Sequence, residues 1–332
     1  MRIALDAMGT DRHPAAEVLG AVRALQDLPG DFEIVLVGDQ PSIEAQLAGV
    51  QGEYPRDRLT IVHTTQCITP SEPAVTAVRR KQDSSIVVGL GLQKQGKADA
   101  FVSAGSTGAV MAASLFLLRP IPGVDRPTVS TILPTAFDPV LLVDSGSNVD
   151  SKPQNLLQFA RLGAVYAQDV LNCESPRVGL LNIGEEPEKG NELTVAAHQL
   201  LRESDLRFVG NVEGRDIVKG VCDVLVTDGF AGNVLLKFYE SVATFMYGMI
   251  ARELKEAGAT IDLDRIFQHF DYTEYGGAPL LGVNGTSIIC HGGSPPRAIK
   301  NAVRAAIRCV ETDLVGHIKG ELAAHPEPAG TA

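Results

Sequence analysis

One loop of this sequence combines a lysine with residues that favour anion binding. Lys189 precedes Gly190 and Asn191, and it follows an apolar stretch at 178–183 that is typical of a buried β-strand. Asn191 is a favoured N-cap, so we expect a helix to begin there with its positive end toward the loop. This placement predicts a phosphate or oxyanion site. The competing interpretation is a solvated lysine balanced by the three glutamates of the same loop.

Further loops place glycine and small polar residues directly after apolar stretches. DGFAGN at 228–233 adds Asn233, an amide donor beside a helix start. Any one such loop could be an ordinary turn, since Asp, Gly and Asn are favoured in turns. Together they predict one shared anion-binding cleft. The residues expected to contact phosphate or substrate are Ser103, Gly105, Ser106, Thr107, Gly108, Asp144, Asn148, Gly190, Asn191, Asp228, Gly229, Gly232 and His291.

Several familiar catalytic patterns do not occur in the sequence. It holds no GxGxxG, GxxxxGK[ST], GxSxG or HExxH motif, which disfavours a standard dinucleotide site, a P-loop, a serine-hydrolase elbow and a zinc protease. The five cysteines are scattered without a CxxC pair, so we expect reduced structural thiols and no metal site. We also expect no cofactor.

The elements that must position these loops alternate between short apolar strands and helices. Six times, a strand-like stretch is followed by a glycine-containing loop and then by a helix pattern; the stretches are RIALDA, EIVLVG, AFVSAG, LLVDSG, RVGLLNIG and DVLVTDG. RFVG at 207–210 adds a further strand. This alternation predicts a three-layer α/β/α fold with a mostly parallel sheet. Ligands of such sheets bind where the strands end. We expect a single domain over residues 1–322, which could consist of two lobes, followed by a flexible tail at 323–332.

A long helix over 231–256 has a wide apolar stripe, and a second helix pattern follows it up to about residue 272. The two patterns predict a helical hairpin that projects from the domain and packs against a second subunit. Ordinary packing against the sheet is the alternative. The residues expected at the hairpin tip are Ile250, Leu254, Ile261 and Leu263.

Composition sets the broad class. With 332 residues, 45% hydrophobic content and a net charge of −11, the chain is an ordinary globular protein. Nucleic-acid binding is disfavoured, because it needs a basic face. The first residues form a strand pattern without a signal-peptide cleavage site, and no uninterrupted apolar run reaches the ~20 residues of a membrane span, so we expect a cytoplasmic protein.

Eight strings in order along nearly the whole chain resemble a known family. They are ALDAMG, RRKQDSS, SAGSTGA, LLNIGEEPEKGNEL, GNVEGRDI, VTDGFAGNVLLK, GGAPLLGVNG and HGGS. They are similar to the bacterial phosphate acyltransferases, which make acyl phosphate from acyl-[acyl-carrier-protein] and inorganic phosphate at the start of phospholipid synthesis. The sequence departs from the family pattern in places, with Ser106 where asparagine is usual and with Ser145 and Ser147 where valine and alanine are common.

The resemblance implies a homodimer with a fold like phosphotransacetylase and isocitrate dehydrogenase. It also implies peripheral attachment to the inner face of the cell membrane through the hairpin, and a downstream glycerol-3-phosphate acyltransferase as a further partner. The family's essential lysine and asparagine match Lys189 and Asn233. We expect Lys189 to bind phosphate and to offset charge in the transition state, and Asn233 to donate to the oxyanion or orient the phosphate. The backbone N–H groups of 105–108 and 229–232 should complete the anion cradle.

The acidic carrier protein needs a basic docking patch on a chain of net charge −11. The candidates are the RRK run at 79–81 and the set Arg297, Lys300 and Arg304. Three alternatives stay open for the activity: a coenzyme A-dependent acyltransferase, a metal- and nicotinamide-dependent dehydrogenase that uses Asp144 and Asp228 as metal ligands, and a non-catalytic membrane scaffold.

Overall fold

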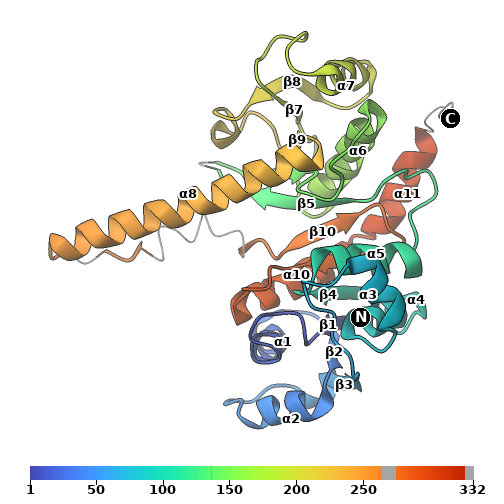
Figure 1. Ribbon diagram of the computed structural model, residues 1–332, viewed down its shortest axis with the longest axis vertical. Helices are drawn as coiled ribbons and strands as arrows, with labels where there is room; N and C mark the ends of the chain where they lie inside the picture. Colours follow the sequence, from blue (N-terminus) through green and yellow to red (C-terminus); the bar gives the residue numbers. More distant parts are fainter. Residues whose placement is uncertain (136, 260, 264–273, 326–332) are drawn as a thin grey trace. The chain divides into compact units, whose positions relative to one another are not determined.

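The computed structural model describes the chain except residues 136, 260, 264–273 and 326–332 (Figure 1). The chain forms two compact units: unit 1 comprises Met1–Pro127 with Tyr275–Ala332, and unit 2 comprises Thr128–Glu274. The predicted single domain over residues 1–322, which allows two lobes, stays a prediction. The α/β alternation continues through both crossings between the units with no linker-like composition, so the sequence does not mark the boundary.

Unit 1 has a six-stranded sheet in the order β3-β2-β1-β4-β11-β10. Neighbouring strands from β3 to β11 run parallel, and β10 runs antiparallel to β11. Leu5 and Ile288 both align with Val102, so the three central strands end level. The strands are β1 (Arg2–Asp6), β2 (Glu33–Gly38), β3 (Leu59–His63), β4 (Ala100–Ser103), β10 (Ala278–Leu281) and β11 (Thr286–Ile289).

Helices cover both faces of the unit 1 sheet. Helices α1 and α10 pack together over one face, and α4 and α5 cover the other, with α3 packed on α5 (Figure 1). The helices are α1 (Ala15–Asp27), α2 (Gln40–Ala48), α3 (Ala74–Arg80), α4 (Ser85–Lys94), α5 (Thr107–Leu117), α10 (Pro296–Glu311) and α11 (Leu314–Ala324), with a 3₁₀ turn at Arg56–Arg58. Residues 323 and 324 belong to α11, because its apolar face continues through the buried Leu322, so the expected tail at 323–332 begins too early.

Unit 2 has a five-stranded sheet in the order β5-β6-β9-β7-β8. Only β5 is antiparallel to its neighbour. Val143 of β6 and Leu180 of β7 both align with Val226 of β9, so these parallel strands also end level. The elements are β5 (Thr128–Leu133), β6 (Val140–Val143), α6 (Pro153–Asp169), β7 (Val178–Asn182), α7 (Glu192–Glu203), β8 (Phe208–Glu213), a 3₁₀ turn at Ile217–Lys219, β9 (Val224–Val226) and α8 (Gly229–Glu256).

Helix α8 has 28 residues and is about 42 Å long at 1.5 Å per residue. Its first turns pack on the core of unit 2 through Leu235, Leu236 and Tyr239. In the stretch 241–257 no residue is buried, and the helix runs away from the strands of its own unit (Figure 1). Over the described residues it is the one helix long and apolar enough to cross a membrane, which the sequence analysis did not predict. The second helix of the expected hairpin lies largely outside the described residues.

Candidate active site

The two residues expected to be catalytic follow neighbouring strands of unit 2. Lys189 belongs to the loop after β7, and Asn233 lies in the first turn of α8, which follows β9. Because β7 and β9 are paired in parallel, both segments leave the sheet at the same edge. The loop after β6, which carries Asp144 and Asn148, leaves at this edge too. This arrangement agrees with the expectation that the glycine loops of one sheet gather at the ends of its strands.

The loop of Lys189 is held by its backbone. The side-chain amide of Asn182 donates to the carbonyl of Lys189 (2.9 Å), and the N–H of Lys189 donates to the carbonyl of Glu186 (3.1 Å). The side chain itself is exposed, and its stem lies over Gly184, where an added Cβ would come within 2.9 Å of Cγ of Lys189. The ammonium group is therefore free to contact solvent or a ligand while its main chain is fixed.

Gly190 and Asn191 join this loop to α7. Gly190 has a φ of +104°, and a Cβ there would overlap the side chains of Thr194 and Asn182, so only glycine fits. Asn191 is the N-cap, as predicted: its side chain accepts from the N–H of Thr194 (2.9 Å). The first two N–H groups of α7, those of Glu192 and Leu193, have no intrahelical partner. They lie close to Lys189 in the sequence.

Asp144 organises the loop after β6. Its buried carboxylate accepts hydrogen bonds from the backbone N–H groups of Gly146, Ser147 and Asn148 at 2.7–2.8 Å. The hydroxyl of Ser147 and the side-chain amide of Asn148 donate to it as well, at 2.6 and 2.8 Å. Both carboxylate oxygens are occupied, so Asp144 and Asn148 shape the loop, and a phosphate contact from Asp144 is not supported.

The backbone N–H groups at the start of α8 also have hydrogen-bond acceptors within the chain. Asp228 caps it by accepting from the N–H groups of Phe230 and Ala231 (both 2.9 Å), while the N–H of Gly229 donates to the carbonyl of Asn148 (2.8 Å). A Cβ at Gly232 would overlap the carbonyl oxygen of Asp144, so this helix rests directly on the Asp144 loop. The expected anion cradle from the backbone at 229–232 is therefore wrong, because these N–H groups already have acceptors within the chain.

Asn233 keeps an exposed side chain at this end of α8. Its side chain lies against Gly146, where an added Cβ would be 3.2 Å from Cβ of Asn233 and 3.4 Å from its Oδ1. Gly146 has a φ of +138°, a conformation that favours glycine. The amide thus lies on the tight Asp144 loop and remains accessible.

The site residues of unit 1 lie at the edge where β1, β4 and β11 end. Ser103 is fully buried, and its hydroxyl donates to Oδ2 of Asp6 (2.6 Å) while accepting from the N–H of Gly105 (3.0 Å). Ser103 therefore supports the loop and does not present its hydroxyl to a ligand. Gly9 packs closely against this loop, since a Cβ there would be 2.6 Å from the nitrogen of Gly105.

The N-terminus of α5 and the loop after β11 complete this edge. Ser106 is the N-cap of α5 and accepts from the N–H of Ala109 (3.4 Å), and Thr107 and Gly108 are exposed in the first turn. His291 is exposed, and its Nδ1 lies 3.1 Å from the N–H of Gly293. The structure therefore brings the predicted residues together in two sets, one in each unit. The single shared cleft stays a prediction.

Two buried acids of unit 1 escaped the sequence analysis. Asp6 ends β1 and accepts from Ser103, and burial raises its pKa. Glu17 lies fully buried in α1 and accepts from the N–H (2.6 Å) and the hydroxyl (3.0 Å) of Thr10. Burial raises the pKa of Glu17 to about 7, while the bonds from Thr10 oppose this. The sequence feature that could have identified Glu17 is an acidic residue on the apolar face of a predicted helix.

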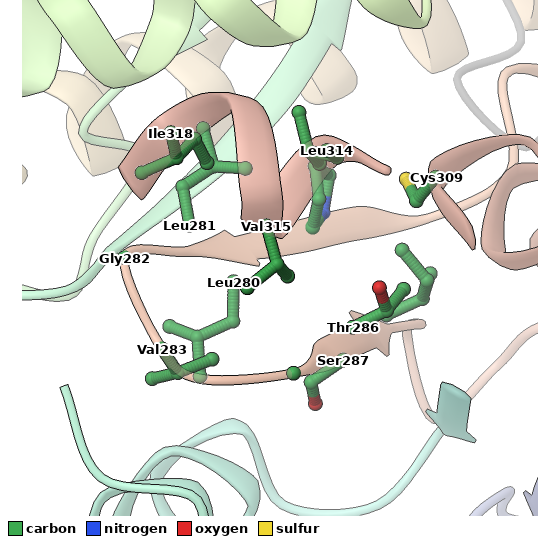
Figure 2. A pocket seen from close by; sticks show the side chains of 13 residues that line it. Leu280, Leu281, Gly282, Val283, Thr286, Ser287, Cys309, Leu314, Val315 and Ile318 are labelled. Atoms are coloured by element: carbon green, nitrogen blue, oxygen red, sulfur yellow. The ribbon is translucent and has the colours of Figure 1, made fainter. Parts of the chain in front are cut away.

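A small pocket lies inside unit 1 beside the β10–β11 hairpin (Figure 2). Its walls are mostly apolar and include Leu280, Val283 and Ile318. It has room for about one water molecule. A fatty acyl chain would not fit, so this pocket is a feature of core packing.

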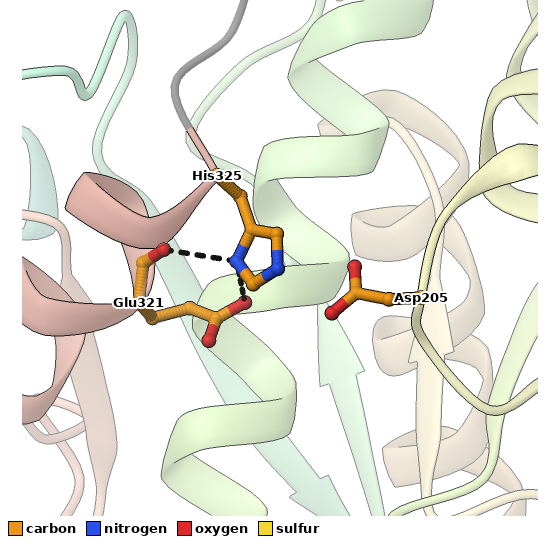
Figure 3. A group of neighbouring side chains, drawn as sticks. All are labelled: Asp205, Glu321 and His325. Carbon is orange, nitrogen blue, oxygen red and sulfur yellow. Dashed lines mark hydrogen bonds and ion pairs between the residues drawn. The ribbon is translucent and has the colours of Figure 1, made fainter.

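Glu321 and His325 lie at the end of α11 (Figure 3). Nδ1 of His325 is 3.1 Å from the backbone carbonyl and 3.2 Å from the carboxylate of Glu321. Figure 3 also draws Asp205, which pairs within unit 2 with Arg161 at 2.8 Å. Such pairings stabilise the structure locally, and we assign no metal to these residues.

Comparison with solved structures defines the fold class. A phosphotransacetylase from Streptococcus pyogenes matches with a TM-score of 0.60 at 18% identity over 94% of both chains. The EutD phosphotransacetylase from Staphylococcus aureus has the same score at 16% identity, covering 93% of this chain and 94% of that one. The predicted phosphotransacetylase-like α/β fold is confirmed.

Sequence comparison identifies the family within this class. A model described as "Fatty acid synthesis protein" matches residues 1–316. Proteins named phosphate acyltransferase from Desulforamulus reducens and Heliobacterium modesticaldum are 51% and 50% identical, over 97% and 99% of both chains. The chain belongs to this phosphate acyltransferase family, as the motifs predict.

Proposed function

We propose that this chain transfers the acyl group of acyl-[acyl-carrier-protein] to inorganic phosphate and so provides acyl phosphate for phospholipid synthesis. The observation that carries the proposal is the exposed lysine of the loop after β7, whose backbone is fixed by Asn182 and which adjoins the N-terminus of α7. The phosphate acyltransferases related to this chain at about half identity support the substrate class.

Phosphate binds next to Lys189. The ammonium group offers a positive charge, and the N–H groups of Glu192 and Leu193 at the start of α7 offer two donors in the field of a helix dipole. These are the groups that a phosphate dianion requires. The three glutamates of the loop are exposed, so solvent and salt weaken their repulsion of the phosphate.

The reaction needs no strong base, because phosphate at neutral pH already carries anionic oxygens. One phosphate oxygen attacks the thioester carbonyl, a new C–O bond forms, and the carbonyl electrons move onto an oxyanion. Collapse breaks the C–S bond and releases the carrier's thiolate, which takes a proton from hydrogen phosphate or water. Lys189 offsets the added charge, and the exposed amide of Asn233 donates to the oxyanion or orients the phosphate.

No covalent acyl-enzyme is part of this scheme. Cys222 and Cys290 are buried, and burial raises the pKa of each thiol to about 12. A thiol with such a pKa is not a nucleophile at neutral pH. Direct attack by phosphate is the simpler course.

In unit 1, the N-terminus of α5 provides a second set of donors. The N–H groups of Thr107 and Gly108 are the first two of this helix, so they have no intrahelical partner. We assign Gly105 to Gly108 to substrate binding, with Ser106 as the cap that fixes the turn. His291, on the loop after β11, is proposed as a further substrate contact at this edge of the sheet.

Helix α8 carries the proposed dimer and membrane contacts. Phe238 and Phe245 are 68% and 63% exposed, an unusual exposure for large apolar side chains in one helix. We propose that a second copy covers this stretch and that the distal end touches the inner face of the cell membrane. Of the expected tip residues, Ile261 is 53% exposed, Ile250 and Leu254 are half-buried, and Leu263 is only 9% exposed. Leu263 is therefore removed from the membrane-facing set.

The structure supports the three alternative activities to different extents. A dehydrogenase that binds a metal through Asp144 and Asp228 is disfavoured, since both carboxylates already accept hydrogen bonds from their own loops. Use of coenzyme A would suit the same site. A scaffold role, with the downstream glycerol-3-phosphate acyltransferase as its partner, does not conflict with activity.

The test is release of free carrier protein from an acyl-loaded carrier by the purified full-length chain. We expect release only when phosphate is present, together with acyl phosphate trapped as the hydroxamate. Release without phosphate, or preference for an acyl-coenzyme A donor, would contradict the proposed reaction.

A further inference from the structure

The charge of this chain is unevenly distributed along the sequence. The full chain carries −11, yet residues 73–124 hold six Lys and Arg against two Asp and Glu, a net of +4. This segment forms α3, α4, β4 and α5, all in unit 1. Neither α3 nor α5 contains an acidic residue. A positive surface on an acidic protein indicates a specific acidic partner, because the rest of the molecule repels one.

The basic residues of this segment are not equivalent. Lys81 is half-buried, donates to the carboxylate of Glu72 and to the carbonyl of Cys67 (both 2.7 Å), and holds the pKa of Glu72 low, at about 2. Lys81 is therefore engaged within the fold. Arg79 and Arg80 are exposed at the end of α3, and only these two of the RRK run can meet a partner.

The two arginines are part of a mixed surface. The guanidinium of Arg79 lies 5.1 Å above the ring of Phe116 on α5, and this ring is 42% exposed. Arg119 follows three residues after Phe116 and is exposed, and Val75, one turn before Arg79, is 49% exposed. An arginine stacked on an exposed aromatic ring, with further exposed arginines on the same two segments, is typical of protein-binding surfaces. We call Val75, Arg79, Arg80, Phe116 and Arg119 the α3–α5 surface.

This surface lies along the helix that begins at a proposed substrate-binding loop. The other end of the α3–α5 pair is at Gly108, where an added Cβ would be 3.2 Å from Cβ of Ala74. From Thr107 to Phe116 the axis of α5 spans about 14 Å. A carrier protein seated here would stand back from the loop by a distance that its flexible prosthetic arm must bridge.

We propose that the α3–α5 surface is the docking site of the acidic acyl carrier protein, with Arg79 and Arg80 as its main electrostatic contacts. This inference rests on the proposed function, which supplies the partner. The competing basic set on α10 fits less well, because Lys300 pairs with Asp27 (2.8 Å) and Arg297 and Arg304 also have interactions within the chain.

The experiment compares two donors: a dodecanoyl-loaded carrier protein and dodecanoyl-pantetheine, which lacks the carrier. In the full-length Arg79→Glu/Arg80→Glu variant we expect KM for the loaded carrier to rise at least about tenfold, with kcat and the rate on dodecanoyl-pantetheine unchanged. KM for the carrier should rise with salt in the wild type, and less so in the variant. Arg23→Glu on α1 is the matched control, an exposed arginine on the opposite face of the sheet, and should not change KM.

The outcomes separate the two proposals. A wild type without phosphate-dependent release would refute the proposed function, whatever the variants do. An active wild type whose carrier KM is unaffected by Arg79→Glu/Arg80→Glu would refute the docking site alone. Loss of vesicle binding in this variant with an unchanged carrier KM would assign the surface to anionic lipid and would also refute it. Phe116→Ala, which keeps the charges, should raise the carrier KM by a smaller factor.

Discussion

The stem of Lys189 lies across Gly184, so that a Cβ at residue 184 would be 2.9 Å from Cγ of the lysine. The same relationship recurs between Asn233 and Gly146. Each proposed catalytic side chain thus lies against a glycine, Lys189 against one of its own loop and Asn233 against one of the loop after β6. A larger residue at Gly184 would move the functional group of Lys189, whereas one at Gly146, with its φ of +138°, would also strain the loop.

Replacing Gly184 by alanine tests this relationship for Lys189. The added methyl group meets flexible side chains, so we expect the fold to survive while the ammonium group shifts. A displacement of about 1 Å at a reacting group costs up to ~10²-fold in rate, so activity should fall by about 10- to 100-fold. Gly214→Ala is the control, because nothing lies within 4 Å of its Cβ position. Equal steady-state rates for both variants would contradict the account of Gly184.

The buried Glu17 predicts a pH dependence of stability. Its pKa is raised from 4.5 in the unfolded chain to about 7 in the folded one, so the folded state holds the proton more tightly. Glu17 therefore weakens the fold progressively as the pH rises from about 4.5 to 7, by about 3 kcal/mol in total.

The Glu17→Gln variant keeps an oxygen for the N–H of Thr10 and does not titrate. Its stability relative to the wild type should grow by up to about 3 kcal/mol between pH 4.5 and 7.5, measured by urea unfolding across this range. Parallel pH profiles for the two proteins would show that Glu17 is charged or neutral throughout.

Helix α8 predicts a dimer that depends on its exposed phenylalanines. Phe238→Asp/Phe245→Asp should yield a monomer in sedimentation velocity. Its Tm at low protein concentration should stay close to that of the dissociated wild type, because both side chains are exposed in one copy. Val218→Asp, another exposed apolar residue of unit 2, is the control. A variant that remains dimeric would place the subunit interface elsewhere.

Membrane contact is predicted for the chain beyond α8. We expect Ile261→Asp to reduce flotation of the protein with vesicles containing anionic lipid, because an exposed apolar side chain no longer enters the interface. Leu263→Ala serves as the comparison, since Leu263 is nearly buried and should change stability rather than flotation. Unchanged flotation of Ile261→Asp would exclude this segment as the anchor.

Much of the fold could be predicted because strand and helix patterns alternate clearly. The strands β1, β2, β4, β6, β7, β8 and β9 and the long helix α8 were all expected near their observed positions. The strands β3, β5, β10 and β11 were missed. β5 lies close to Pro127 and Pro134 and β10 contains Pro279, a residue that disfavours strands, while β3 is an edge strand without a buried residue, so their apolar patterns are weak.

The candidate site was predictable by residue type but not by role. Asp144, Asp228 and Ser103 were expected to contact a ligand, yet each is used by its own loop. A sequence does not reveal whether a polar side chain faces outward or bonds to the turn that carries it, because loops favour the same residues for both purposes. Glu17 was missed for a related reason, since its partner, the Thr10 backbone, is defined only in the folded chain.

The most direct test of the central claim is a double-mutant cycle between Lys189 and Asn233. Each single alanine variant should lower kcat by about 10²–10³-fold with an unchanged Tm, while Glu188→Ala, next to the lysine and also exposed, should be near wild type. If both side chains act on the same phosphate and oxyanion, the double variant loses little beyond the worse single one. Fully additive losses, or near-normal activity of either single variant, would contradict a joint role for the two residues.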